Sequence, residues 1–238
     1  MTTLFWDIDG TLLTTAKAGV PAWEAAVLEL TGRPFQLSSI RVPGLTDYQI
    51  AARTFELLEI ESEGDLIGRV VRRYEDLLPE TLPSRQGSVL PNVRQILESA
   101  RGRSDIRSYL LTGNTRGGAR AKLTHYDLMQ YFPDGAFAED AGDRATIAER
   151  ALALARRDGP VDEQHVFVIG DTPHDVRCAN AIGARTIAVA TGGYTASELA
   201  EHSPWRVFEA LPPADEFLRL VVEPDGLPST NGPSRTTR

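Results

Sequence analysis

The chain has 238 residues and a mass of 26.0 kDa, enough for one large domain or two smaller ones with hydrophobic cores of their own. Hydrophobic residues make up 42% and charged residues 24%, which is ordinary usage for a globular protein and excludes a fibrous or wholly disordered chain. The net charge is −8, and the basic residues form no cluster. Because acidic surfaces repel phosphate-rich polymers and anionic lipids, we expect no nucleic-acid partner and no membrane partner.

The lack of a membrane-span pattern or a secretory-signal pattern, together with the cysteine content, predicts a cytoplasmic protein. No apolar stretch approaches the roughly 18 residues of a membrane span. The apolar run near the N-terminus is interrupted by Asp7 and Asp9, which does not fit a secretory signal. Cys178 is the single cysteine, so an internal disulfide and a cysteine-rich zinc site are both excluded. We therefore expect the reducing environment of the cytoplasm.

Short apolar runs followed by turn residues recur along the chain and predict buried strands. They cover residues 4–8, 108–111, 165–169 and 186–190, with a weaker run at 207–208. Between them, apolar residues recur at helical spacing over residues 91–100, 117–126, 144–157 and 176–182. Strands that alternate with helices favour an α/β fold, here a three-layer, Rossmann-like core with a parallel sheet covered on both faces.

The segment from 14 to 87 has a different pattern. It carries helical spacing over residues 20–30, 46–58 and 65–78, and no convincing strand. We predict that residues 14–87 form an inserted all-helical domain and that residues 1–13 and 88–221 form the catalytic core. Residues 222–238 are rich in Pro, Gly, Ser and Thr, which predicts a disordered tail.

Acidic side chains follow two of the predicted strands. Asp7 and Asp9 come directly after the first apolar run, and Asp171 and Asp175 come directly after the run at 165–169. Ligands of parallel sheets bind outside the carboxyl ends of the strands. Carboxylates gathered there invite a cation, and an all-oxygen ligand set favours Mg²⁺. The sequence therefore predicts a magnesium site at this edge of the sheet.

The predicted core also contains polar and basic residues that could bind an anion. Thr112, Gly113 and Asn114 follow the predicted strand at 108–111, where a hydroxyl and free backbone N–H groups can cradle a phosphate. A cation should neutralise that phosphate. Arg144 opens a predicted helix and is favoured over Lys122, which is expected inside the helix 117–126 and away from a strand end.

Three motifs in this order resemble the haloacid dehalogenase-like hydrolase superfamily. Its Asp-x-Asp-Gly-Thr motif is present as residues 7–11, its apolar strand ending in Ser or Thr as residues 110–114, and its Gly-Asp-x-x-x-Asp motif as residues 170–175. The chain is most similar to the phosphoglycolate phosphatase-like and β-phosphoglucomutase-like branch, and the helical insertion stands at the position of the family's cap domain. It departs from the family at Arg144, where a lysine is usual.

The resemblance implies roles for the site residues. Asp7 would attack phosphorus and form an aspartyl-phosphate, and Asp9 would act as general acid and base. Mg²⁺ would be held by Asp7, the backbone carbonyl of Asp9, and Asp171. Thr112, Gly113, Asn114 and Arg144 would bind the phosphate, and Asp175 would orient a metal-bound water or Arg144.

Substrate recognition is expected from the helical insertion, with Thr46 and Asp47 as candidate contacts. The alternative for Thr46 is a capping box with Gln49. The function that fits best is a Mg²⁺-dependent phosphatase of a small phosphorylated metabolite. Alternatives are a phosphomutase acting on a sugar phosphate and a non-catalytic binding module on the same fold. The sequence leaves the identity of the metabolite and the oligomeric state open.

Overall fold

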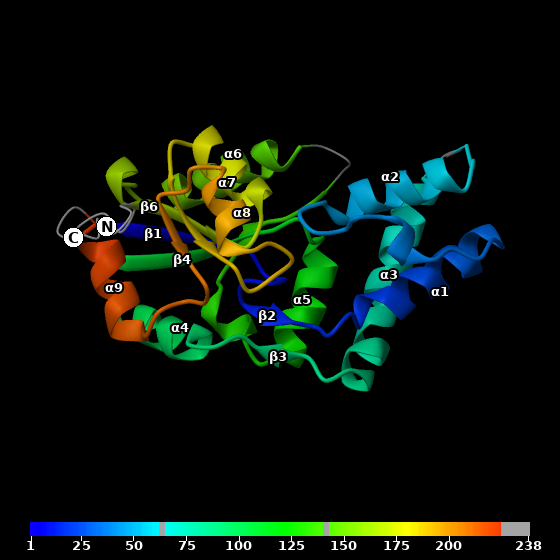
Figure 1. Ribbon diagram of the computed structural model, residues 1–238, viewed down its shortest axis with the longest axis horizontal. Coiled ribbons are helices and arrows are strands. Elements are labelled where there is room, and N and C mark those ends of the chain that lie inside the picture. Colours follow the sequence, from blue (N-terminus) through cyan, green and yellow to red (C-terminus); the bar gives the residue numbers. More distant parts are fainter. Residues whose placement is uncertain (62–64, 140–142, 225–238) are drawn as a thin grey trace, which may run out of the picture.

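A parallel sheet forms the centre of the protein (Figure 1), as seen in a computed structural model that describes residues 1–61, 65–139 and 143–224. Within these ranges the sheet has six strands in the order β5-β4-β1-β6-β7-β8, and every neighbouring pair is parallel. The strands are β1 (Thr2–Trp6), β4 (Ile106–Leu111), β5 (Gly135–Ala136), β6 (Val166–Gly170), β7 (Arg185–Val189) and β8 (Arg206–Phe208).

Helices cover both faces of this sheet. Along the fully buried strand β1, Leu4 and Trp6 share one hydrophobic cluster with α4 (Val93–Arg101), α5 (Arg116–His125) and α9 (Ala214–Val222). Phe5 points to the opposite face and packs with α6 (Arg144–Arg157) and α7 (Pro173–Ala181). Alternate side chains of a strand face opposite sides, so one strand joins both helical layers. The predicted three-layer α/β core is confirmed.

A second group of helices lies at one end of the molecule, beyond the sheet (Figure 1). It contains α1 (Gly19–Thr31), α2 (Asp47–Leu57) and α3 (Leu66–Thr81), which pack around a cluster that includes Trp23, Phe55 and Leu78. The three helices predicted between residues 14 and 87 are therefore present. We refer to them and their connecting loops as the cap. The division of the chain into domains at 13/14 and 87/88 stays a prediction.

Two chain crossings join the cap to the core. A short antiparallel pair, β2 (Leu13–Thr14) and β3 (Ser88–Val89), brings the outgoing and returning segments together. These strands have two residues each, too few for a periodic pattern, so the sequence did not predict them. The remaining elements are α8 (Ala196–Ala200) and the 3₁₀ turns Leu37–Ser39, Leu82–Ser84, Met129–Tyr131 and Glu163–His165.

Some element bounds differ from the sequence prediction. β1 ends at Trp6 rather than residue 8, because the chain leaves the sheet at Asp7. α7 begins at Pro173, where the fixed φ of proline suits the first helical turn. α9 was not predicted and ends at Val222, so the predicted tail begins no earlier than residue 223. Residues 225–238 of that tail lie outside the described residues.

Candidate active site

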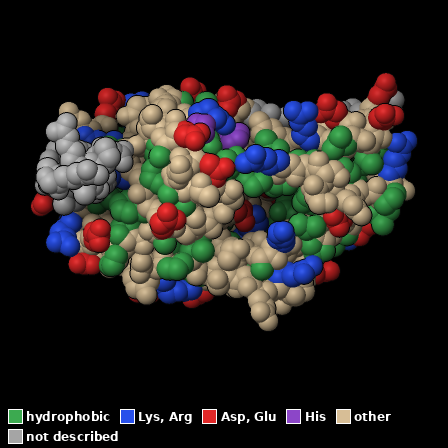
Figure 2. All heavy atoms as spheres, in the orientation of Figure 1, with side chains coloured by type: hydrophobic (Ala, Val, Ile, Leu, Met, Phe, Trp, Pro, Cys, Tyr) green, Lys and Arg blue, Asp and Glu red, His purple; other side chains and the backbone are tan. Residues whose placement is uncertain are grey.

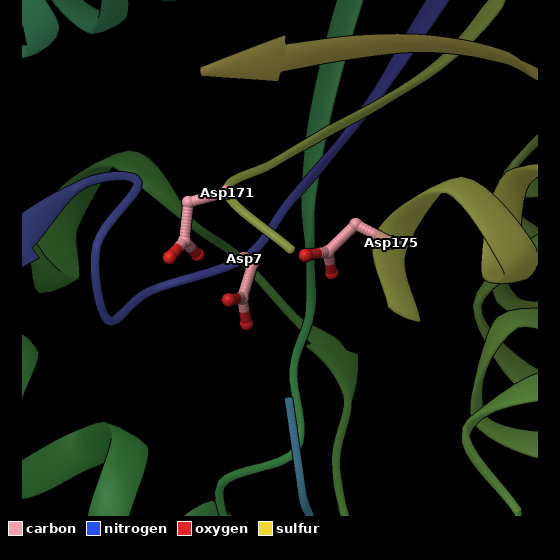
Figure 3. Close-up of side chains that lie close together, drawn as sticks. All are labelled: Asp7, Asp171 and Asp175. Carbon is pink, nitrogen blue, oxygen red and sulfur yellow. The ribbon is translucent and has the colours of Figure 1, made fainter. Parts of the chain in front are cut away.

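Asp7 and Asp171 lie at the carboxyl ends of adjacent parallel strands. Residues Trp6 of β1 and Ile169 of β6 are register partners, and each aspartate comes just after the strand that carries it. The backbone N–H of Asp7 donates to the carbonyl of Ile169 at 3.0 Å, which continues the ladder to the edge of the sheet. The strand register therefore brings together two acids that are far apart in the sequence (Figure 3).

Asp175 completes a cluster of three buried carboxylates with Asp7 and Asp171. Each of the three offers an oxygen within 4.8 Å of the others, and their exposed fractions are 5% for Asp7, 3% for Asp171 and 0% for Asp175. Figure 3 shows Asp175 reaching toward the pair from the first turn of α7. Its carboxylate also accepts from the N–H (3.0 Å) and hydroxyl (2.7 Å) of Thr172, which fixes its orientation.

The electrostatics of this carboxylate cluster favour a cation. Burial, followed by the charge of Asp175, raises the pKa of Asp7 from 3.8 to about 7, although nearby Arg144 opposes the shift. Burial, followed by the charge of Asp7, likewise raises the pKa of Asp171 well above its ordinary value. Like charges this close disfavour each other's ionised form. A divalent cation among these oxygens would relieve the repulsion, and the all-oxygen donor set fits Mg²⁺.

Arg144 is the cation beside the carboxylate cluster. It is 4% exposed, and its Nη2 lies 2.7 Å from Asp175 Oδ1 and 3.6 Å from Asp7 Oδ1. Arg144 is the first residue of α6, and Asp143 caps that helix by accepting from Ala145 N at 3.0 Å. The guanidinium Nε has no hydrogen-bond partner among the described residues. The Arg144 guanidinium therefore lies beside Asp7 and Asp175 and lines the cavity, and its phosphate-binding role stays a prediction.

The predicted anion cradle directly follows β4, which pairs with β1 on the side opposite β6. Gly113 and Asn114 line the central cavity, whereas Thr112 lies behind them and is fully buried. The Thr112 hydroxyl accepts from Asn114 Nδ2 at 2.8 Å and from Asn114 N at 3.3 Å. Since Oγ1 accepts both bonds, the hydroxyl proton can be donated to Asp7, and this hydrogen bond acts to lower the pKa of that carboxyl.

Lys122 also lies in this site, which corrects the prediction that it would be remote from a strand end. Its Nζ is 2.6 Å from Asp9 Oδ2 and 2.6 Å from Asn114 Oδ1. Burial by itself lowers the pKa of Lys122, but the charges of Asp9 and Asp47 outweigh it and keep the pKa above the usual value. The ammonium therefore stays charged.

The sequence carried a signal for Lys122 that the prediction did not use. The buried positions of α5 are Gly118, Ala119, Lys122 and Leu123, so the lysine belongs to the helix face that packs on the core. A charged residue on such a face is rarely left without a partner. Its long side chain spans the distance from the helix to the strand tip.

Asp47 connects the cap to the loop after β4. Its Oδ2 accepts from Thr115 N at 2.8 Å, and its own N–H donates to the Gly113 carbonyl at 2.9 Å. Burial raises the pKa of Asp47 to about 6, with Lys122 opposing the shift. Asp47 also lines the cavity, so it is placed both to hold the loop and to face a ligand.

Thr46 serves α2 as its N-cap. Its hydroxyl accepts from Gln49 N, and the Gln49 side chain accepts from Thr46 N, each at 3.1 Å. This reciprocal pair is the capping box that the sequence offered as the alternative role. Thr46 is fully buried, with 0% of its surface accessible, and it does not line the cavity. The structure therefore supports the capping role for this residue.

A cavity of about 950 Å³ lies between the core and the cap. Figure 2 shows a hollow on this face of the molecule. Asp7, Asp9, Lys122, Arg144 and Asp171 line its core side. Its cap side combines apolar and charged residues: Val20, Ile40, Val42, Ile50, Lys17, Glu24 and Arg41. A cavity of this size accommodates a small organic molecule.

Two glycines permit the close approach of the chain to Asp171. Gly10 has φ +82°, and a Cβ built on it would overlap the Asp171 carboxylate. Gly192, in the loop after β7, would also overlap that carboxylate if it carried a side chain. The loop after β7 therefore borders the site, and Gly192 lines the cavity.

An α/β core with acidic side chains at the tips of its central strands, roofed by a helical cap, defines a class of hydrolases. The sequence matches the model of the haloacid dehalogenase-like hydrolase family over residues 4–189. The chain belongs to this family. The predicted resemblance to the family and to its phosphoglycolate phosphatase-like branch is confirmed.

Similar proteins include a probable phosphatase, IndB, from Dickeya dadantii, which is 26% identical over 226 residues and aligns with 93% of this chain and 96% of its own length. A phosphoglycolate phosphatase from Cereibacter sphaeroides is 29% identical over 231 residues, with 91% of this chain and 98% of the relative aligned. The crystal structure of a hydrolase from Pseudomonas syringae has a TM-score of 0.68 at 23% identity, covering 92% of this chain and 98% of the neighbour.

None of the helices in the described part of the chain is both long and apolar enough to cross a membrane.

Proposed function

We propose that the protein is a Mg²⁺-dependent phosphatase that hydrolyses a small phosphorylated metabolite through an aspartyl-phosphate. The observation that carries this proposal is the position of Asp7, whose carboxylate lies within 4.8 Å of Asp171 and Asp175 and 3.6 Å from the Arg144 guanidinium. A nucleophile set between a cation and a group of acidic ligands suits attack on a phosphate dianion. The relatives named phosphatases support the same conclusion.

Asp7 and Asp171 are the side chains that would hold the metal, together with the backbone carbonyl of Asp9. The fit rests on the raised pKa values of the two buried carboxylates, which mark uncompensated negative charge. When bound, Mg²⁺ supplies a positive charge that offsets the repulsion between the carboxylate and the substrate phosphate. Asp175 is already bonded to Arg144 and Thr172, so it would orient the site from behind.

The reaction has two displacements at phosphorus. An Asp7 oxygen forms a bond to phosphorus as the ester P–O bond breaks, and the leaving oxygen keeps the electron pair and takes a proton from Asp9. Water then attacks the same phosphorus and gives a proton back to Asp9, while the bond to Asp7 breaks and inorganic phosphate leaves. The Asp9 side chain is 42% exposed and lines the cavity, so it can reach both the leaving group and water.

Phosphate binding falls to the loop after β4 and to Arg144. Gly113 and Asn114 line the cavity at this strand tip, and the buried Thr112 hydroxyl supports them by accepting from Asn114 Nδ2. The Arg144 guanidinium lines the cavity and lies 3.6 Å from Asp7. Preorganised donors directed at the phosphoryl oxygens stabilise the charge that these oxygens carry in the transition state.

The experiment is a panel of phosphorylated metabolites, phosphoglycolate and sugar phosphates included, assayed for phosphate release with Mg²⁺ and with EDTA. Asp7→Asn is the negative control, because it keeps the shape of the side chain but removes the nucleophile. We expect at least one ester to be hydrolysed only with Mg²⁺ and only by the unmodified enzyme. If the folded protein releases no phosphate from any ester, or if Asp7→Asn retains full activity, the proposal is wrong.

A further inference from the structure

Two cations, Arg144 and Lys122, contact different carboxylates of the active site. Arg144 contacts Asp175 and Asp7, at distances of 2.7 and 3.6 Å, and so serves the nucleophile. Lys122 contacts Asp9 and Asn114, each at 2.6 Å, and so serves the residue that transfers protons. The two basic groups come from different helices, α6 and α5, and approach different carboxylates. One cation therefore does not substitute for the other.

Lys122, Asp9 and Asn114 form a closed hydrogen-bonded triangle. Lys122 Nζ donates to Asp9 Oδ2 and to Asn114 Oδ1, while Asn114 Nδ2 donates to the same Oδ2 of Asp9 at 2.8 Å. Asn114 Nδ2 also donates to Thr112 Oγ1 at 2.8 Å, which ties the triangle to the loop after β4. Each member is thus held by two others, and the amide of Asn114 is oriented by its bonds on both ends.

The geometry singles out one oxygen of Asp9 for chemistry. Both donors use Oδ2, so Oδ1 takes no part in the triangle. Asp9 lies beyond the end of β1 with 42% of its side chain exposed, so sheet packing does not fix its rotamer. Lys122 is 6% exposed and anchored on the buried face of α5, which makes it a rigid support for a flexible carboxylate.

We propose that Lys122 is a positioning residue that holds Asp9 with Oδ1 turned toward the leaving group, and that it does not bind the substrate phosphate. This inference rests on the proposed phosphatase function. A proton donor must lie within hydrogen-bond distance of the leaving oxygen, and misplacement by about 1 Å can lower the rate by a factor on the order of 100. Without Lys122, Asp9 keeps its chemical identity but loses its orientation.

The test compares an alkyl phosphate with p-nitrophenyl phosphate as substrates of Lys122→Met. The value of kcat/KM reports the steps up to departure of the leaving group, and p-nitrophenolate departs without a proton. We expect kcat/KM to fall by roughly 100-fold for the alkyl ester and by less than about 3-fold for the aryl ester. Equal losses on both esters would show phosphate binding by Lys122 and would overturn the proposal.

A double-mutant cycle with Asp9→Asn gives a second criterion. If Lys122 acts only through Asp9, adding Lys122→Met to Asp9→Asn causes little further loss on the alkyl ester. Independent, multiplicative losses would contradict the proposal.

Lys122→Arg, which keeps a cationic donor, is expected to recover part of the activity. Arg120→Met is the matched control, because Arg120 is an exposed residue of the same helix.

A crystal structure of Lys122→Met tests the inference apart from activity. We expect the Asp9 carboxylate to leave its present position, and an unchanged Asp9 would overturn the positioning role even if no substrate were known. Lys122→Gln, which keeps an N–H donor without the charge, serves if the methionine variant does not fold. If the unmodified protein has no phosphatase activity, the proposed function is refuted instead, so the two failures are distinguishable.

Discussion

The carboxylates of Asp7 and Asp171 meet because the strands that precede them are hydrogen-bonded neighbours in parallel register, with Trp6 opposite Ile169. Both strands are buried on every residue, so their register is fixed by packing on two faces. A slip of one residue would turn Asp7 away from Asp171. The site is therefore a consequence of the central sheet, and its acidic pair is as rigid as the core beneath it.

The raised pKa of Asp7 predicts that the metal-free protein loses stability as pH rises. The folded state binds a proton on Asp7 more tightly than the unfolded chain, with a pKa of about 7 against 3.8. This stabilisation is complete below about pH 4 and is lost as pH rises through about 7. At pH 8 in EDTA, Asp7→Asn should therefore be more stable than the unmodified protein, with a free energy of unfolding higher by on the order of 1 kcal/mol or more. Its Tm should be higher accordingly.

Thermal melts between pH 5 and pH 8 in EDTA check this prediction. The unmodified protein should show the steeper fall in Tm as pH rises. A smaller fall should remain in Asp7→Asn, because the pKa of Asp171 is also raised. Identical pH dependence in both proteins would contradict the assignment of this charge to Asp7.

Magnesium is expected to stabilise the protein through Asp171. A ligand that binds only the folded state adds roughly 1.4 kcal/mol at about ten times its Kd, which corresponds to roughly 3–6 °C in a chain of this size. Asp171→Asn should abolish most of the Mg²⁺-dependent rise in Tm. Asp76→Asn, in an exposed part of α3, changes the net charge equally and should keep the full rise. A rise of equal size in both variants would place the ion elsewhere.

Arg144 is expected to bind the phosphoryl group with a geometry that lysine cannot reproduce. Arg144→Lys keeps one positive charge beside Asp175 but loses the planar fork of the guanidinium. We expect the inhibition constant of inorganic phosphate to rise about tenfold, equivalent to roughly 1.4 kcal/mol. Arg156→Lys, at an exposed position in the last turn of the same helix, is the matched control. If both variants are inhibited as strongly as the unmodified enzyme, Arg144 is not a phosphate ligand.

Thr46 should matter for stability and not for substrate binding. Thr46→Ala removes the hydroxyl that accepts from Gln49 N and should lower the free energy of unfolding by about 1 kcal/mol, within the range of roughly 0.5–2 kcal/mol for N-caps. Chemical denaturation measures the first quantity and steady-state kinetics the second. A marked increase in KM without loss of stability would return Thr46 to the list of substrate contacts.

Arg144 and Lys122 show which parts of the site the sequence could predict. The helix that begins at Arg144 was predictable because helix starts carry local signals such as the Asp143 cap, whereas the role of Arg144 in phosphate binding stays a prediction. Lys122 was misplaced because it lies inside a helix, in the last turn of α5, where the sequence indicates which face is buried but not which element that face packs against. Asp47 was predicted as a substrate contact in the cap, and that role stays a prediction. Its bond to Thr115, a residue 68 positions away, was not predicted.

The sequence by itself determined the acids, the strands that present them and the family, because an apolar run followed by Asp7 and Asp9 is a local pattern of backbone and side-chain chemistry. Only the tertiary structure decided which cation serves which carboxylate. Lys122 and Asp9 are 113 positions apart, and their contact depends on the rotation and packing of α5 against the sheet. Such a contact is set by the packing of whole elements, which no short stretch of sequence encodes.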